Sequence, residues 1–247
     1  MEDVINTTAL DVDSLPRDGV IRRLLIHLVE DGTGLPVEVP VMVLRGKHPG
    51  PVFGLTAALH GNEINGIPVI HNLMRWLEQH PLRGTVVAAV VVNVPGFHLH
   101  QRPYIDGTDL NHIMPGRADG NAAELYAHRL LERIVGRFDY LVDLHTASFG
   151  RHNSLYVRAD MEHEIVREMA VKVRPEIILH NPAADGTLRG AATAMGIPAI
   201  TLEIANPQSF QPEYIKSSLI GLRLVMNDLG MLRRPHANPG PKPIVCS

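Results

Sequence analysis

The stretch VFGLTAALHGNE, residues 52–63, joins an apolar run to two side chains that can bind a metal or transfer a proton. Residues 50–59 predict a buried strand, and His60 and Glu63 follow at its end. Two later apolar runs end similarly, in Asp143-Leu144-His145 and in Thr201-Leu202-Glu203. Because ligands of open α/β sheets bind beyond the carboxyl ends of the strands, we expect these side chains to converge.

Strand-like and helix-like stretches alternate along the chain. Residues 20–30 and 37–45 predict a hairpin across the turn-rich segment 31–34. Further strands are expected at 85–93, 140–144, 154–158, 176–179 and 198–204, and helices at 64–79, 121–138, 161–173, 188–195 and 212–229. This alternation predicts an α/β fold: a mixed, mostly parallel twisted sheet with helices on both faces.

Length and composition favour one sizeable domain. The chain has 247 residues, of which 45% are hydrophobic, and we expect a catalytic α/β domain over residues 1–232. Residues 233–247 hold four prolines and predict a tail. Residues 94–119 form a long stretch rich in Pro, Gly and His, and such a stretch within a compact domain is usually functional.

Charge and cysteine content exclude several classes of partner. The net charge is −3 and no Lys/Arg run occurs, so we expect neither nucleic acid nor an anionic membrane as a partner. Residues 1–6 lack the features of a secretory signal, and the apolar runs are too short to span a membrane. The single cysteine, Cys246, excludes disulfides and a Cys-based metal site, which favours a cytoplasmic protein. The sequence leaves open whether the chain forms a homo-oligomer.

Two imidazoles and a carboxylate form a known catalytic zinc set with a fourth position for water. Taken singly, the His60/Glu63 pair could be a chance pair in a loop, His145 a buried structural histidine, and Glu203 an ion-paired carboxylate. Together, at three strand ends, they favour a site for one Zn²⁺ per chain. Bound zinc lowers the pKa of water to roughly 7 and polarises a substrate carbonyl.

Four motifs occur in the order seen in one enzyme family. They are His60-Gly61-Asn62-Glu63, Asp109-Leu110-Asn111, Asp143-Leu144-His145 and Leu202-Glu203. On these motifs the chain resembles the succinylglutamate desuccinylase/aspartoacylase family over about residues 50–230. The resemblance implies a zinc carboxypeptidase-like fold and a zinc-dependent deacylase related to the metallocarboxypeptidases.

The resemblance also implies roles for the matching residues. His60, Glu63 and His145 are the expected zinc ligands. Glu203 is the expected general base, which takes a proton from the attacking water and passes it to the leaving amine. Arg102 is similar in placement to the family arginine that stabilises the tetrahedral oxyanion; the alternative is a solvated loop arginine.

Three further residues have expected supporting roles. Asn111 resembles the family asparagine that helps to hold the substrate carboxylate; the alternative is a turn residue. Asp109 is expected to accept a hydrogen bond from His60, as its family counterpart does. Asp143 lies two positions before His145 and shares its strand face, so it is the expected partner of that imidazole. The alternative for both acids is a simple loop or strand-end carboxylate.

The chain departs from the family pattern in two places. The usual arginine after Asp-Leu-Asn is replaced by His112, which donates one hydrogen bond where the guanidinium donates two. Arg117, Arg151 or Arg158 could substitute in binding the carboxylate, or the substrate lacks that group. Family members also usually carry a small β-rich domain after the catalytic one, so residues 233–247 are either the start of a linker to an absent domain or the end of a short member.

The leading interpretation is a zinc-dependent amidohydrolase that removes an acyl group from an N-acyl amino acid or similar small amide. The alternatives are a metallocarboxypeptidase acting on peptides and a degenerate member that binds metal or ligand without turnover. The match of the Arg102–Asn111 segment favours the deacylase. The presence of Glu203 argues against a binding protein, since binding alone does not require a general base.

Replacing His112 by arginine is expected to lower KM for substrates with a free α-carboxylate, because a bidentate guanidinium replaces a single imidazole donor. Steady-state kinetics on an N-acyl amino acid and its carboxamide test this effect, and the carboxamide serves as the uncharged control. An unchanged KM for the acid would contradict the prediction.

Overall fold

The computed structural model describes residues 4–148, 150–182, 184–233 and 243–246. Through this part of the chain runs one ten-stranded sheet, in the order β1-β2-β3-β5-β4-β6-β9-β7-β8-β10. The strands are β1 (Val4–Thr7), β2 (Ile21–Glu30), β3 (Pro36–Arg45), β4 (His48–Ala57), β5 (Arg83–Ala89), β6 (Tyr140–His145), β7 (Leu155–Ala159), β8 (Ile177–His180), β9 (Ala199–Ile204) and β10 (Ile244–Cys246). The helices are α1 (Gly66–Leu77), α2 (Val94–His98), α3 (Ala122–Arg133), α4 (Glu164–Val173), α5 (Leu188–Ala194) and α6 (Pro212–Asp228), with short 3-10 helices η1 (Leu110–His112) and η2 (Val135–Arg137).

Most neighbouring strands are parallel. Antiparallel pairing joins β2 to β3, β3 to β5 and β7 to β9, and the other neighbours run in the same direction. The predicted hairpin is confirmed as β2–β3, but the sequence did not indicate that β7 runs against β9. The predicted α/β class with a mixed, mostly parallel sheet is confirmed.

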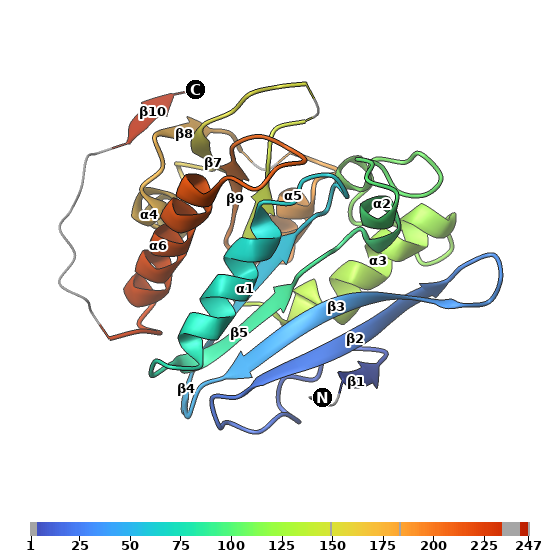
Figure 1. Cartoon of the computed structure of the whole chain (residues 1–247), viewed down its shortest axis with the longest axis horizontal. Helices are drawn as coiled ribbons and strands as arrows, with labels where there is room; N and C mark the ends of the chain where they lie inside the picture. The colour runs from blue at the N-terminus through green and yellow to red at the C-terminus, as the bar shows by residue number, and fades with distance from the viewer. Residues whose placement is uncertain (1–3, 149, 183, 234–242, 247) are drawn as a thin grey trace.

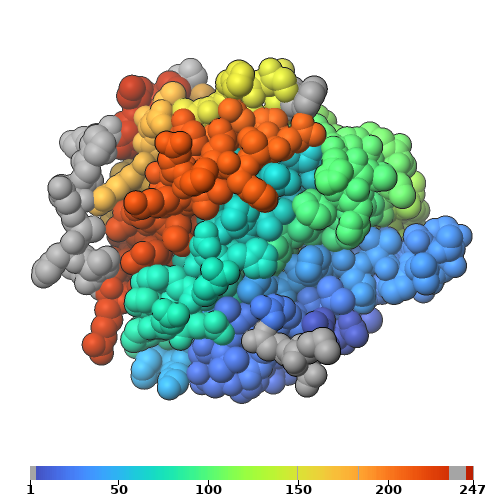
Figure 2. Space-filling view, in the orientation of Figure 1, coloured from blue at the N-terminus to red at the C-terminus, as the bar shows by residue number. Residues whose placement is uncertain are grey.

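Helices cover both faces of the sheet, as predicted. Helices α1, α4 and α6 pack on one face, over strand residues that include Leu55, Leu144 and Leu202. Helices α3 and α5 pack on the other face, over Leu141 and Ala199. Figure 1 shows α1 and α6 in front of the sheet, with β1 and β10 at its opposite edges. In the same orientation, Figure 2 shows the surfaces of these two helices adjoining.

The spacing of apolar residues accounts for helix α1. The position of its first residue limits the length of the loop that holds His60 and Glu63. Ile70, Leu73 and Leu77 are buried at helical spacing. A Cβ atom on Gly66 would lie 2.8 Å from the Cβ atoms of Ala57 and Leu144, so only glycine lets the helix begin this close to β4 and β6. The loop between β4 and α1 is therefore short and pressed against the sheet.

The differences from the sequence-based expectation lie in short elements. The sequence predicted neither β1 nor β10, and helix α2 and helix η1 interrupt the long segment expected to be irregular. Such elements have too few residues to show a period, and β10 exists through its pairing with β8. In the expected tail, residues 234–242 and 247 lie outside the described residues, and the division at residue 232 stays a prediction. No helix in the described part of the chain has the length and hydropathy needed to cross a bilayer.

Replacing Gly54 by alanine is expected to destabilise the fold by about 1–3 kcal/mol, the usual cost of overpacking a core. The added Cβ atom would lie 2.0 Å from the ring of Phe138, which is itself buried. Urea unfolding measures the change. Gly32→Ala in the β2–β3 turn is the matched control, because its added Cβ atom would have no neighbour within 4 Å. Equal stability of the two variants would contradict this account of β4.

Candidate active site

The candidate site occupies the face of the sheet that α3 and α5 cover, where this face reaches the carboxyl ends of β6 and β9. Along β6 the face changes from the core residue Leu141 to Asp143 and then His145. The register of β6 and β9 sets Asp143 beside Thr201 and His145 beside Glu203. Strand alternation thus brings two pairs of polar side chains onto one face.

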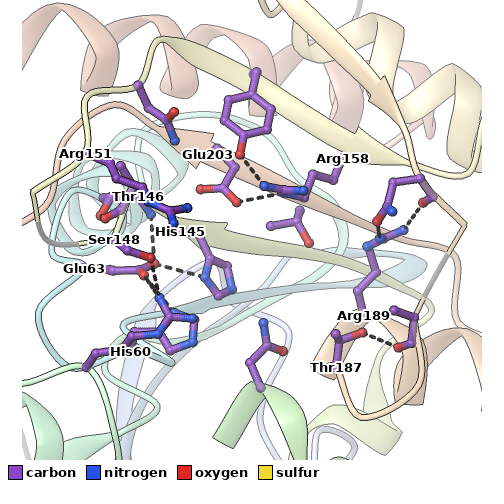
Figure 3. A pocket seen from close by; sticks show the side chains of 18 of the residues that line it. His60, Glu63, His145, Thr146, Ser148, Arg151, Arg158, Thr187, Arg189 and Glu203 are labelled. Atoms are coloured by element: carbon purple, nitrogen blue, oxygen red, sulfur yellow. Dashed lines mark hydrogen bonds and ion pairs between the residues drawn. The ribbon is translucent and has the colours of Figure 1, made fainter. Parts of the chain in front are cut away.

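The neighbouring strand β7 extends these rows. Its register sets Tyr156 opposite Glu203 and Arg158 opposite Thr201. The direction of β7 therefore decides which of its side chains meet Glu203. These residues line one pocket of about 510 Å³, together with residues of four loops. Figure 3 shows His60, Glu63 and His145 on one side of this pocket, with Arg189 and Thr187 on the other and Glu203 and Arg158 between them.

Sharp turns bring the loops to the sheet edge. Ala58 follows β4 and Ala205 follows β9, and both have positive φ, 52° and 54°. This conformation costs a residue with a Cβ atom roughly 1–2 kcal/mol. Each turn lies two residues from His60 or Glu203, so local strain accompanies the placement of both side chains.

His60, Glu63 and His145 form a buried cluster that can hold a metal ion. One ligand atom from each residue lies within 4.8 Å of the other two. Nδ1 of His60 lies 2.8 Å from Oε1 of Glu63, and Nδ1 of His145 lies 3.0 Å from Oε2 of the same carboxylate. Both imidazoles therefore direct the same nitrogen toward one carboxylate.

The other nitrogen of each imidazole contacts an aspartate. Nε2 of His60 lies 3.1 Å from Asp109, and Nε2 of His145 lies 2.6 Å from Asp143. A carboxylate that accepts the Nε2–H leaves Nδ1 with a free lone pair, which is how proteins orient histidine toward a metal. Nδ1 of His60 is buried and, among the described residues, has no partner in hydrogen-bond geometry. The donor set and this unpartnered atom fit a divalent cation such as zinc.

The electrostatics keep the Glu63 carboxylate ionised. Burial alone would raise its pKa, but His60 and His145 hold the pKa of Glu63 at about 2. The backbone N–H of Thr146 also donates to its Oε2 at 3.0 Å. Glu63 is thus an anion at neutral pH, as a metal ligand must be.

Glu203 has different surroundings, although it lines the same pocket as Glu63. Burial raises the pKa of Glu203 above its ordinary value, while His145 and Arg158 act in the opposite direction. Nε of Arg158 donates to Oε1 of Glu203 at 3.1 Å. A carboxyl group with a raised pKa beside the cluster is suited to accept a proton and return it.

Arg102 lies beside the cluster in the same pocket. It donates from Nη1 to Glu63 at 2.9 Å and to Ser148 at 3.0 Å, and from Nε to Asp109 at 3.0 Å. These bonds hold the guanidinium in one orientation, and its Nη2 atom makes no hydrogen bond to another described residue. The sequence placed Arg102 here through a motif, but it gave no sign of Ser148.

The other expected substrate-binding residues separate in space. Asn111 lines the pocket, and its Oδ1 accepts the backbone N–H of Leu188 at 2.8 Å. His112 also lines the pocket, but its side chain is 74% exposed and lies 3.9 Å from Asp109. Arg117 is not among the pocket residues; it pairs with Asp119 in solvent.

Sequence reasoning missed Arg189. This arginine is buried, lines the pocket and donates to the backbone and side-chain oxygens of Asn181 at 2.9 and 2.6 Å. A β-bridge between Met114 and Gly186 brings the loop before α5, the helix that carries Arg189, beside the segment that carries Asn111. The sequence predicted the helix that carries Arg189 but held no signal for this long-range contact.

Asn65 joins the loop that carries His60 and Glu63 to the segment that follows β9. Its Nδ2 donates to the backbone oxygens of Ile204 and Asn206 and to the side chain of Gln211. Its Oδ1 accepts the backbone N–H of Gln211 at 3.1 Å. This buried side chain therefore fixes the segment after Glu203 relative to the segment after Glu63.

A family comparison covers most of the chain. The model of the succinylglutamate desuccinylase/aspartoacylase catalytic domain matches residues 49–228. Among curated proteins, the N-alpha-acetyl-L-2,4-diaminobutyric acid deacetylase of Halomonas elongata is 32% identical over 111 residues. That match covers 44% of this chain and 32% of the deacetylase, so the chain matches about a third of this relative's length.

Solved structures share the fold at low sequence identity. The product-bound ectoine utilization protein EutE (DoeB) of Ruegeria pomeroyi has a TM-score of 0.80 and 22% identity, over 94% of this chain and 74% of that one. A succinylglutamate desuccinylase/aspartoacylase of Rhodobacter sphaeroides has a TM-score of 0.78 and 22% identity, over 92% and 70%.

Proposed function

The chain belongs to the succinylglutamate desuccinylase/aspartoacylase family, and from this premise we propose that it is a zinc-dependent hydrolase. We infer that it removes an acyl group from an N-acyl amino acid or similar small amide. The observation that carries the proposal is the placement of Glu203 beside the buried His60–Glu63–His145 cluster in one pocket. The neighbouring register positions of His145 and Glu203 on β6 and β9 account for this placement.

His60, Glu63 and His145 would hold the zinc ion. Bound zinc would supply Lewis acidity at a position open to water and to the amide carbonyl. Asp109 and Asp143 would keep both Nδ1 atoms directed at the ion by accepting the Nε2 protons.

The protein side chains would carry the protons and the developing charge. Glu203 accepts a proton from the attacking water as the new C–O bond forms. It then gives this proton to the amine nitrogen as the C–N bond breaks, so the reaction consumes one water and releases a carboxylate and an amine. Arg102 donates to the oxygen on which negative charge develops, and its fixed orientation avoids an ordering cost at that moment.

The size and polarity of the pocket favour a small substrate. A pocket of about 510 Å³ accommodates an acyl amino acid, and arginine, asparagine and hydroxyl side chains line its walls. The name of the Halomonas relative describes removal of an acetyl group from an amino acid, which supports the acyl amino acid class. A cytoplasmic location and a homo-oligomer stay predictions.

Replacing Glu203 by glutamine is expected to lower kcat for amine release by about 10²–10⁴-fold, because the proton acceptor is lost. Zinc content should stay near one ion per chain, since Glu203 is not a proposed ligand. Replacing His145 by glutamine should lower both zinc content and kcat. The assay is amine release from N-acetyl and N-succinyl amino acids and short peptides, with zinc measured by elemental analysis.

Removal of zinc by a chelator and its return provide the control. Activity should vanish and then recover in the unaltered protein. Turnover of peptides alone would favour the carboxypeptidase. A Glu203→Gln protein with normal activity would contradict the proposed role of this carboxyl group.

A further inference from the structure

We propose that Arg158 binds a carboxylate of the substrate, in place of the arginine that the family resemblance would put at position 112. This inference rests on the proposed hydrolase function and adds a residue that determines its specificity. It answers a question that the sequence left open, because three arginines were candidates for the task.

The structure separates these three candidates. Arg117 lies outside the pocket, and its guanidinium pairs with Asp119 in solvent. Arg151 lines the pocket but is exposed, so water screens its charge. Arg158 lines the pocket from the regular strand β7 and is half-buried. Only Arg158 therefore combines a rigid support with partial shielding from water.

Two contacts hold the Arg158 guanidinium in place. Its Nε donates to Glu203 at 3.1 Å, and its Nη2 donates to the hydroxyl of Tyr156 at 2.6 Å. Nη1 has no hydrogen-bond partner among the described residues, and one N–H of Nη2 is unused. These two nitrogens form the edge through which a guanidinium grips a carboxylate with two parallel hydrogen bonds. The group is thus ordered before the substrate arrives, which lowers the entropic cost of binding.

The side of the pocket that Arg158 and Arg189 line could bind a further anion. Arg189 lines the same pocket, is buried, and donates to the neutral side chain and backbone of Asn181. No ion pair of Arg189 occurs within the described part of the chain, and Glu203 is the carboxylate that pairs with Arg158. The Asp143 and Asp160 carboxylates act on the Arg189 guanidinium from a distance without pairing with it. A substrate carboxylate would give the half-buried Arg158 guanidinium a further anionic partner besides Glu203.

The register of β7 and β9 makes Arg158 a bridge between substrate and general base. Arg158 stands opposite Thr201, diagonal to Glu203 on the same face of the sheet. A substrate carboxylate on its free edge would lie near Glu203, which Figure 3 shows between the His60–Glu63–His145 cluster and Arg189. Binding of this group would thus orient the substrate relative to Glu203.

The carboxylate could belong to the amine half or to the acyl half of the substrate, and three probes distinguish these sources. They are the N-acetyl amino acid that the protein hydrolyses fastest, its carboxamide, and the N-succinyl form of that carboxamide. If the protein prefers the N-acetyl amino acid to the neutral carboxamide, the carboxylate belongs to the amine half; if it prefers the N-succinyl carboxamide, the carboxylate belongs to the acyl half. In Arg158→Gln protein we expect the ratio of kcat/KM between the preferred charged probe and the neutral one to fall by about 10- to 100-fold, the effect of lost charge-assisted hydrogen bonds.

Two further variants serve as comparisons for Arg158→Gln. Arg158→Lys should lose part of the preference, because a lysine keeps the charge without the bidentate edge. Arg75→Gln on the exposed side of α1 is the matched control and should keep the preference. If Arg158 only positioned Glu203, Arg158→Gln would lower kcat for charged and neutral probes alike, and this outcome would overturn the proposal.

Calorimetry gives a readout that needs no turnover. Succinate and succinamide are titrated into zinc-loaded Glu203→Gln protein and into zinc-loaded Glu203→Gln/Arg158→Gln protein. Both proteins carry Glu203→Gln because loss of Arg158 alone would leave the Glu203 carboxylate unpaired, and its charge would repel succinate. The first protein should prefer succinate, and the second should lose about 10- to 100-fold of that preference. Equal preference in both would overturn the role of Arg158. A preference that depends on Arg158 in a protein that hydrolyses no probe would contradict the proposed hydrolase instead.

Discussion

A buried carboxylate is costly unless charged or polar groups surround it, and Glu63 meets this constraint at the centre of the site. Its two oxygens face one imidazole each, and Arg102 and the Thr146 N–H supply further donors. These groups come from three different segments of the chain. Their positions depend on one another, because displacing any of them would leave charge buried without a partner.

The sheet satisfies this constraint through register. On the face under α3 and α5, the row Thr56–Asp143–Thr201–Arg158 crosses four strands, and the row His145–Glu203–Tyr156 lies beyond it. Thr56 donates to Asp143 at 2.6 Å, so the first row supports the imidazole of the second. The opposite face of the same strands stays apolar to its end and packs against α1 and α6. The first face thus carries the candidate site beyond its apolar core, while the second is apolar throughout.

Local patterns in the sequence predicted the elements that repeat over many residues. The apolar period of residues 64–79 predicted α1, and the strand-end positions of His60, His145 and Glu203 predicted that they converge. Contacts between distant segments left no such pattern. The antiparallel direction of β7 and the burial of Arg189 depend on loops that meet only in the folded chain. The exposure of Arg117, likewise, followed from tertiary structure that its local sequence does not encode.

His60, Glu63 and His145 are the proposed ligands of one zinc ion, which the Nδ1 atoms of both imidazoles would bind. Crystals grown with zinc and measured just above and just below the zinc absorption edge test this assignment directly. We expect one anomalous peak per chain at this cluster, within about 2.0–2.3 Å of both Nδ1 atoms and a Glu63 oxygen. A peak bonded to Nε2 atoms, or zinc bound only elsewhere on the protein, would contradict the account.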